Sequence, residues 1–117
     1  MHESAREPND LERLFVERAN AGDVDGLVAL YEPTAVLVPE NGERMVGTEQ
    51  LQAFFTGFLK NRPKLARSIQ SPALHFGEFA LTSSRHSNGD VSVEIARRQP
   101  DGSWLWVMDR FSILDNA

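Results

Sequence analysis

The sequence predicts an α+β fold in which helices come first and a long antiparallel sheet follows. Apolar residues at helical spacing are confined to the first half of the chain, up to about residue 60. From residue 64 onward, short extended segments are separated by turn signals, of which Asn88-Gly89 is the strongest. The connections between these segments are too short for parallel crossovers, so strands from residues 64 to 113 should pair antiparallel, with the helices on one face.

Composition narrows the class of protein. The 117 residues are enough for one domain, and 41% apolar with 25% charged residues is ordinary for a globular protein. A net charge of −5 without a run of Lys or Arg argues against a nucleic-acid partner. The chain has no cysteine, which excludes disulfides and thiol chemistry. No apolar run has membrane length or resembles a signal peptide, so we expect a cytoplasmic protein that does not contact membranes.

Three helices are predicted, over residues 9–21, 23–31 and 48–60. Asn9 and Asp23 stand where helix caps are expected, and Gly22 can end the first helix in a left-handed conformation. The polar segment over residues 1–8 precedes this pattern and is expected to be disordered, which leaves a single domain over residues 9–117.

The extended segments begin with a hairpin over residues 35–47, in which Asn41-Gly42 suggests a type I′ turn. After the third helix, strands are predicted over residues 64–76, 79–87, 90–98 and 103–113.

Register places the polar residues of the sheet. If Asn88-Gly89 is a two-residue turn, Arg85 opposes Ser92. If residues 99–102 form a four-residue loop, Ser92 also opposes Asp109. One face then holds Arg85, Ser92, Glu94, Leu105, Val107, Asp109 and Phe111. The other holds Val91, Val93, Ile95, Trp104, Trp106 and Met108.

Arg85, Glu94 and Asp109 are the candidate catalytic residues. Burial raises the pKa of a carboxyl group and a neighbouring guanidinium lowers it, so two carboxylates beside one arginine can separate into a base and an acid. The alternatives are a structural salt bridge, or a different register that leaves all three in solvent. No spacing of His, Asp and Glu suits a metal ion, so we expect no metal and no cofactor.

The segment "FVERANAGDVDGLVALYEPTAVLVPENGERMVGTEQLQAFF" followed by a "DGSW" strand resembles the SnoaL-like branch of the nuclear transport factor 2-like superfamily. The resemblance covers residues 9 to 114. It implies three helices on a strongly curved sheet that forms a cone-shaped pocket, and a homodimer through the outer sheet face. This fold hosts isomerases, cyclases, hydrolases and proteins without activity, so it implies no single reaction.

Ketosteroid isomerase, a member of this superfamily, provides three positions to compare. The position of its oxyanion-holding tyrosine is Phe15 here, which has no hydroxyl group. The position of its general base is Pro39, which cannot accept a proton. Its second oxyanion-hole acid falls on Glu94. The resemblance therefore argues against that mechanism, whereas Asp109 matches the last-strand aspartate of limonene epoxide hydrolase, a related enzyme.

The expected ligand is a small hydrophobic or polyketide-like molecule, and a non-catalytic ligand-binding or dimerisation module is the alternative. The pocket is expected to be lined by Phe15, Tyr31, Phe55, Phe58, Ser92, Val107 and Phe111. The apolar face that carries the two tryptophans needs a cover, because exposed apolar patches of this size mark interfaces. We therefore expect a homodimer through Val91, Val93, Ile95, Trp104, Trp106 and Met108, with Trp106 more central than Trp104.

Overall fold

The computed structural model describes residues 2–114, so the last part of the predicted domain lies outside the described residues. Its three helices are α1 (Asp10–Asn20), α2 (Val24–Val28) and α3 (Gly47–Phe58). All three were predicted, but α2 is shorter than expected because the chain enters the sheet at Tyr31. Within the described residues, no helix has the length and apolarity needed to cross a membrane.

The helix ends agree with two of the three predicted signals. The Asp23 carboxylate accepts a hydrogen bond from the Gly26 backbone N–H at 2.8 Å and so caps α2. Gly22 ends α1 with a φ of +70°, which favours glycine. The prediction for Asn9 is wrong: it makes no capping bond, and its amide donates to Gln70 Oε1 at 3.1 Å instead.

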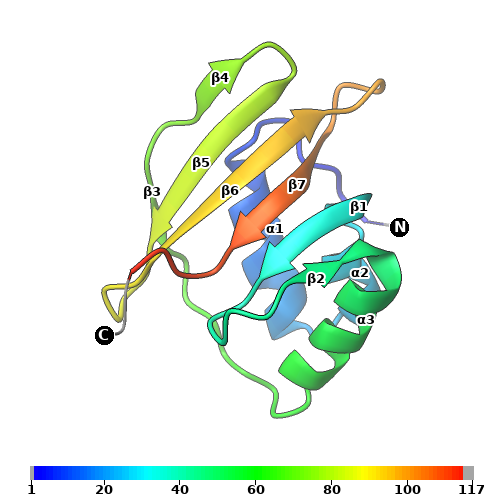
Figure 1. Cartoon of the computed structure of the whole chain (residues 1–117), viewed down its shortest axis with the longest axis vertical. Coiled ribbons are helices and arrows are strands. Elements are labelled where there is room, and N and C mark those ends of the chain that lie inside the picture. Colours follow the sequence, from blue (N-terminus) through cyan, green and yellow to red (C-terminus); the bar gives the residue numbers. More distant parts are fainter. Residues whose placement is uncertain (1, 115–117) are drawn as a thin grey trace.

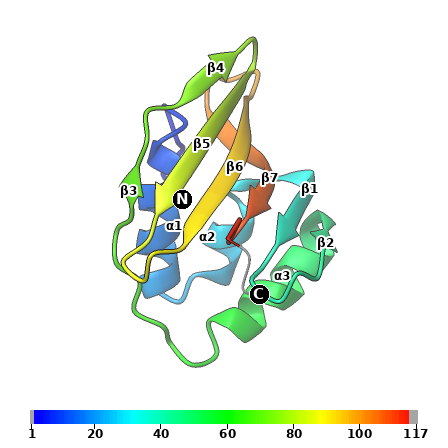
Figure 2. The same ribbon diagram turned by 60° about the vertical axis from the view of Figure 1, so that its left-hand side comes forward.

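Over residues 2–114, seven strands form one curved sheet that packs against the helices (Figures 1 and 2). They are β1 (Tyr31–Val38), β2 (Met45–Val46), β3 (Ile69–Gln70), β4 (Leu74–Phe76), β5 (Phe79–Arg85), β6 (Val91–Arg98) and β7 (Trp104–Arg110). Their order is β2-β1-β7-β6-β5-β3, with β4 also beside β5. Every pair among β3 to β7 is antiparallel, as predicted. The sheet as a whole is mixed rather than antiparallel, because β1 runs parallel to β7.

The first hairpin joins β1 to β2 by a wider turn than the sequence suggests. Val36 pairs with Val46, and the turn closes with a hydrogen bond of 2.9 Å from the Gly42 N–H to the Pro39 carbonyl. Gly42 has a φ of +81°, but Asn41 does not adopt a positive φ. A type I′ turn needs positive φ at both central residues, so that prediction is wrong.

The β5–β6 hairpin has a three-residue loop instead of the predicted two-residue turn. The His86 N–H donates to the Asp90 carbonyl at 2.8 Å, and Gly89 takes a φ of +91°. This is the geometry of a type I turn followed by a left-handed residue. The extra residue shifts β5 by one position, so Arg85 opposes Val91 and Thr82 opposes Glu94.

A bulge in β7 changes the second half of the register. Ala96 pairs with Trp106 but Ile95 pairs with Met108, so Val107 has no partner on β6. As a result Trp106 and Asp109, three residues apart, both point to the helix-covered face.

The inward position of the two tryptophans has a different cause: the loop between β6 and β7 has three residues, 100–102, instead of the predicted four over residues 99–102. The Gln99 N–H donates to the Ser103 carbonyl at 2.7 Å, and Arg98 opposes Trp104 rather than Ser103. The prediction that Trp104 and Trp106 lie on the outer face is therefore wrong: they are 6% and 4% exposed, in the core.

The core is the inner face of the sheet packed against one stripe of each long helix. Its apolar members are Ala5, Leu11, Leu14, Ala19, Leu27, Leu30, Tyr31, Ala35, Leu37, Leu51, Phe55, Leu59, Ala80, Ala96, Trp104 and Trp106. The strands β5 and β6 contribute mainly small or polar residues to this face. Their large apolar residues point the other way.

Large apolar residues on the outer face of the sheet form a row across six strands. Each member opposes the next in the sheet register: Leu74, Leu81, Ile95, Met108, Val36 and Val46. Four of the six are exposed, with Leu74 at 67% and Met108 at 50%. We call this set the outer apolar row.

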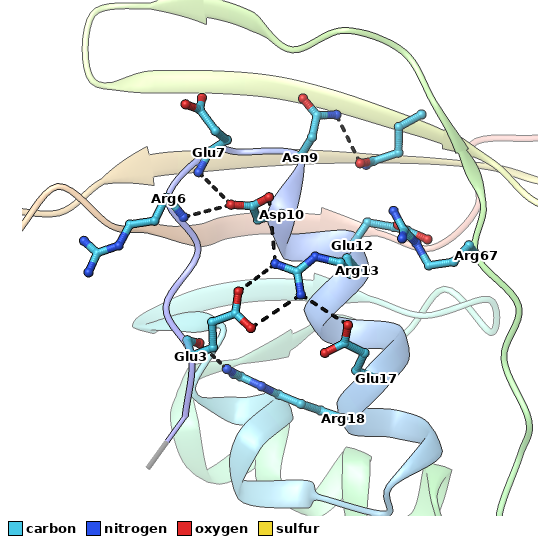
Figure 3. Close-up of polar contacts among 11 residues, drawn as sticks. Glu3, Arg6, Glu7, Asn9, Asp10, Glu12, Arg13, Glu17, Arg18 and Arg67 are labelled. Carbon is cyan, nitrogen blue, oxygen red and sulfur yellow. Dashed lines mark hydrogen bonds and ion pairs between the residues drawn. The ribbon is translucent and has the colours of Figure 1, made fainter.

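The segment before α1 is ordered, which corrects the prediction of disorder for residues 1–8; Met1 lies outside the described residues. Ala5 forms a β-bridge with Trp104 and is buried. Arg18 is buried beneath the segment, where its guanidinium donates to the backbone carbonyl of Glu3 (Figure 3). It also donates to the backbone carbonyl of Gly26. The polar composition of the segment gives no sign that it is ordered, because the contacts that hold it in place are made by its backbone.

Candidate active site

A cavity of about 380 Å³ lies between α1, the segment after α3, and the inner faces of β5 to β7. Its lining residues are Glu12, Phe15, Val16, Glu40, Phe58, Lys64, Leu65, Ala66, Ser84, His86, Ser87, Asn88, Asp90, Ser92, Glu94, Trp106, Asp109 and Phe111. Exposed members such as Glu40, Lys64 and Asn88 mark its open side. Buried members such as Glu94 and Asp109 mark its floor.

Two carboxyl groups oppose each other on the floor. Glu94 on β6 and Asp109 on β7 are direct partners in the sheet register, and they are 5% and 6% exposed. Thr82 Oγ1 donates a hydrogen bond to Glu94 Oε1 at 2.8 Å. The Tyr31 hydroxyl donates to Asp109 Oδ2 at 2.5 Å. Each carboxyl group therefore has its own hydroxyl donor on the protein side.

The electrostatics of this pair favour protonation. Burial raises the pKa of Asp109 well above its ordinary value, the charge of Glu94 raises it further, and the hydrogen bond from Tyr31 opposes both. Burial also raises the pKa of Glu94, against hydrogen bonds from Ser92 and Thr82 that lower it. Neither carboxyl group forms an ion pair with any residue between 2 and 114. The protonated form of each carboxyl group on the cavity floor is thus favoured.

Arg85, the third predicted catalytic residue, lies outside the cavity. The one-residue shift of β5 turns its side chain to the outer face, where it is exposed and opposes Val91. The prediction that Arg85 contacts Glu94 or Asp109 is wrong. Without this guanidinium, no cation opposes the effect of burial, which raises the pKa of both carboxyl groups.

Four of the predicted ligand-binding residues line the cavity: Phe15, Phe58, Ser92 and Phe111. Tyr31 stands behind the wall and reaches the site through its hydrogen bond to Asp109. Phe55 is fully buried in the core behind Phe15, with ring centroids 5.9 Å apart. Val107 is the bulge residue of β7 and does not line the cavity, so its prediction is wrong.

One part of the cavity wall is aromatic. Phe15 on α1 packs edge-on against Trp106 at 5.9 Å and against Phe111 at 6.2 Å between ring centroids. Aromatic rings bury large areas and favour such edge-to-face contacts. The cavity therefore combines an apolar wall with two carboxyl groups, the composition of a site for a largely apolar small molecule.

Among the residues of the site and its support that the sequence reasoning missed are Glu12, Thr82, Ser84, His86 and Trp106. Glu12 is buried on α1 and accepts hydrogen bonds from Arg67 Nε at 2.6 Å and from the Ser68 N–H at 2.8 Å. It thus holds the segment that covers one side of the cavity. For Thr82, Ser84 and His86, the signal was the alternative three-residue reading of the loop around Asn88-Gly89, which turns these side chains inward.

Two further results bear on the chemistry. Phe15 lines the cavity without a hydroxyl group, and Pro39 is not among the lining residues, so the ketosteroid isomerase positions supply neither an oxyanion donor nor a base. Among residues 2–114, no group of three or more His, Cys, Asp or Glu side chains is placed to hold a metal ion.

Comparison with known proteins supports the fold and names a family. The sequence profile of the SnoaL-like domain matches residues 12–116. No curated protein matches the chain. Among solved structures, a putative calcium/calmodulin-dependent protein kinase type II association domain from Thiobacillus denitrificans is 14% identical, with a TM-score of 0.76 over 97% of this chain and 100% of that one. A protein of unknown function with a cystatin-like fold from Nostoc punctiforme is 18% identical, with a TM-score of 0.69 over 92% and 89%.

A ketosteroid isomerase-like protein from Erwinia carotovora atroseptica is 13% identical, with a TM-score of 0.66 over 92% of this chain and 94% of that one. Identities this low establish a shared fold and leave the activity open. The activity has to be argued from the cavity itself.

Proposed function

The chain belongs to the SnoaL-like domain family, and on that basis we propose that it binds a small, largely apolar molecule in the cavity and transfers a proton on it with the Glu94–Asp109 pair. The observation that carries the proposal is the direct opposition of two buried carboxyl groups on the cavity floor without a cation. One carboxylate accepts a proton from the bound molecule, and the protonated partner returns one at a second position.

The charges around the cavity restrict the ligand. Its lining carries five carboxyl groups against one lysine and one histidine. An anion would meet repulsion from the floor, whereas a neutral or cationic molecule would not. The aromatic wall favours a ring system or a branched hydrocarbon skeleton. The preferred ligand is therefore an uncharged or cationic molecule with an apolar body.

Native mass spectrometry of the freshly purified chain tests binding. We expect a small molecule that co-purifies with the wild-type chain and with Arg85→Ala, because Arg85 lies outside the cavity. Phe15→Glu, which places a charge on the aromatic wall, should lose it while keeping the fold by circular dichroism. Retention of the same molecule by Phe15→Glu would place it elsewhere and would contradict the proposal.

A second proposal concerns assembly: the chain forms a homodimer through its outer sheet face. The outer apolar row supports this proposal. Single apolar residues are common on protein surfaces, whereas a continuous row of large apolar side chains across six strands is typical of an interface. A hollow of about 230 Å³ on this face, lined in part by Val93, Ile95 and Met108, could receive side chains of a second copy. A symmetric contact would bury the same row on both protomers.

Sedimentation velocity tests the dimer. The wild-type chain should sediment as a dimer at tens of micromolar, and Leu81→Glu, which places a charge in the row, should shift it to monomer. Arg85→Glu on the same strand but outside the row is the matched control. A wild-type monomer at that concentration would contradict the assembly. If a dimer forms but no ligand is ever found, the dimerisation module is the better description.

A further inference from the structure

Ser84 on β5 places a buried hydroxyl group on the floor of the cavity. Its side chain lines the cavity, and the residue is 2% exposed. It opposes Ser92 on β6 in the sheet register, and Ser92 shares a face with Glu94, two residues further along the same strand. A ligand that fills the cavity would therefore lie against both the carboxyl pair and Ser84.

A chain of two side-chain amides determines how the Ser84 hydroxyl group can bond. The Asn9 amide donates to Gln70 Oε1 at 3.1 Å and to the Ser71 carbonyl at 3.2 Å. Because the Gln70 oxygen is held by Asn9, its Nε2 amide group is turned to the floor, where it donates to Ser84 Oγ at 3.1 Å. Ser84 is the acceptor in this bond, so its own proton is left for another partner.

The hydroxyl groups around Ser84 have partners of a different kind. Thr82 Oγ1 donates to Glu94, and the Tyr31 hydroxyl donates to Asp109. Ser92 Oγ lies 3.0 Å from His86 Nε2. In the part of the chain that the structure describes, the bond from Gln70 is the one side-chain hydrogen bond of Ser84. A buried donor without an acceptor is unfavourable, and a ligand in the cavity can supply the acceptor.

We propose that Ser84 donates a hydrogen bond to an oxygen atom of the ligand, at a polar subsite separate from the carboxyl pair. Asn9 and Gln70 are positioning residues, because they act by leaving the Ser84 proton free to point into the cavity. The subsite rests on the proposed function and makes it more specific. Besides the group on which the carboxyl pair acts, the ligand carries an acceptor oxygen, such as that of an ether, a hydroxyl or a carbonyl group.

The sheet register sets the distance between the two polar positions. Ser84 and Glu94 are diagonal neighbours on adjacent strands, because Ser84 opposes Ser92 and Glu94 follows two residues later. Such neighbours lie roughly 7–8 Å apart. A rigid ring system that packs on Phe15 and Phe111 can present one polar group to each position. The expected ligand is thus an apolar ring system with polar groups at two separate points on its edge.

Matched pairs of naphthols test the subsite. Both members of a pair carry the naphthol hydroxyl group, and they differ at one further ring position, which holds a methoxy group in one compound and an ethyl group in the other. The two groups are close in size, but only the methoxy oxygen accepts a hydrogen bond. NMR titration of the full chain gives each dissociation constant. The tightest-binding methoxy compound should bind the wild type about 2- to 10-fold more tightly than its ethyl partner, which is the effect of one hydrogen bond.

Three variants show whether the Ser84 proton causes this preference. Ser84→Ala removes the proton and should abolish the preference for the methoxy compound. Gln70→Glu keeps Ser84 but replaces its donor with a carboxylate that accepts the Ser84 proton, so it should abolish the preference as well. Ser83→Ala alters the neighbouring residue, which does not line the cavity, and should retain it. Circular dichroism checks that each variant is folded, and the ethyl compound should bind all of them alike.

Equal binding of both members of every pair by the wild type would overturn the subsite and leave the binding proposal standing. A preference that survives in Ser84→Ala would also overturn it, because another group would then hold the oxygen. A preference that survives only in Gln70→Glu would overturn the positioning role of Gln70. If no naphthol binds, the cavity does not accept an apolar ring system, and the binding proposal fails together with the subsite.

Discussion

Glu94 on β6 and Asp109 on β7 face each other across the sheet as direct register partners, and both are buried without a cation beside them. Burial and mutual repulsion raise the pKa of Asp109 well above its ordinary value, and burial raises that of Glu94. A folded chain therefore holds protons on this pair that an unfolded chain would release. The stability of the fold therefore depends on pH through these two carboxyl groups.

Asp109→Asn should change the pH dependence of stability. Because the folded pKa of Asp109 is raised, its stabilising contribution is full below the unfolded pKa and is lost as pH rises through the folded pKa. The wild-type free energy of unfolding should thus contain a term that falls with pH by at most about 1.4 kcal/mol per unit. Urea unfolding across this range should show a shallower fall for Asp109→Asn. An identical slope in both chains would count against a raised pKa.

Glu32→Gln is the control for this prediction, because the pKa of Glu32 is shifted in the direction opposite to that of Asp109. The Glu32 carboxylate accepts from Arg97 Nε at 2.8 Å, and this partner lowers its pKa. Its contribution is present above the unfolded pKa and is lost as pH falls through the folded pKa. Glu32→Gln should therefore lose stability at neutral pH and little in acid. The same urea series would show whether the pH dependence of the free energy of unfolding changes in opposite directions in the two variants.

Tyr31→Phe should destabilise the chain by about 1–3 kcal/mol, because it removes the hydroxyl that donates to a buried carboxyl group. The loss should be greater at a pH where Asp109 is ionised, since hydrogen bonds to charged acceptors are the stronger ones. Urea unfolding on both sides of the titration checks this. Equal losses at both pH values would indicate that the hydroxyl does not distinguish the two forms of Asp109.

Arg85→Ala should change the free energy of unfolding by less than about 0.5 kcal/mol, because the side chain is exposed and outside the cavity. Glu94→Ala on the neighbouring strand should have a larger effect, since it empties part of the cavity floor and leaves Thr82 without its acceptor. Thermal unfolding of the two variants compares them directly. A large loss of stability for Arg85→Ala would instead support the register predicted from the sequence, in which this arginine faces the carboxyl pair.

Arg18→Ala should release the segment before α1. The buried guanidinium donates to the carbonyls of Glu3 and Gly26, so its loss should cost about 2–4 kcal/mol. Arg6 lies on the same segment with an exposed side chain that points away from this network, which makes Arg6→Ala the matched control (Figure 3). Hydrogen exchange of the Trp104 amide, which bonds to the Ala5 carbonyl at 3.0 Å, reports the release.

Local signals predicted the elements of this fold well. The helical spacing of Leu11 and Leu14 and the cap at Asp23 depend on residues a few positions apart, and the structure agrees with them. The antiparallel pairing of β3 to β7 also followed from short connections. The parallel contact of β1 with β7 joins residues about seventy positions apart, and no local pattern indicates it.

Register was harder to predict, because one residue decides which face every side chain occupies. The loop around Gly89 has three residues instead of two, and this moves Arg85 out and Thr82 in. The bulge at Val107 then brings Trp106 and Asp109 to the same face, which strict alternation forbids. The apolar residues of β5 and β6 also favoured the wrong assignment of faces, because the larger ones lie on the outer face instead of in the core.

The carboxyl carbon shift of Asp109, followed by NMR through a pH titration, tests the central claim most directly. In the wild type it should titrate above the ordinary range of an aspartate, and in Glu94→Gln its pKa should fall, because the charge that opposes its ionisation is gone. An Asp109 that titrates in the ordinary range, or that is unmoved by Glu94→Gln, would contradict an electrostatically coupled pair of buried carboxyl groups on the cavity floor.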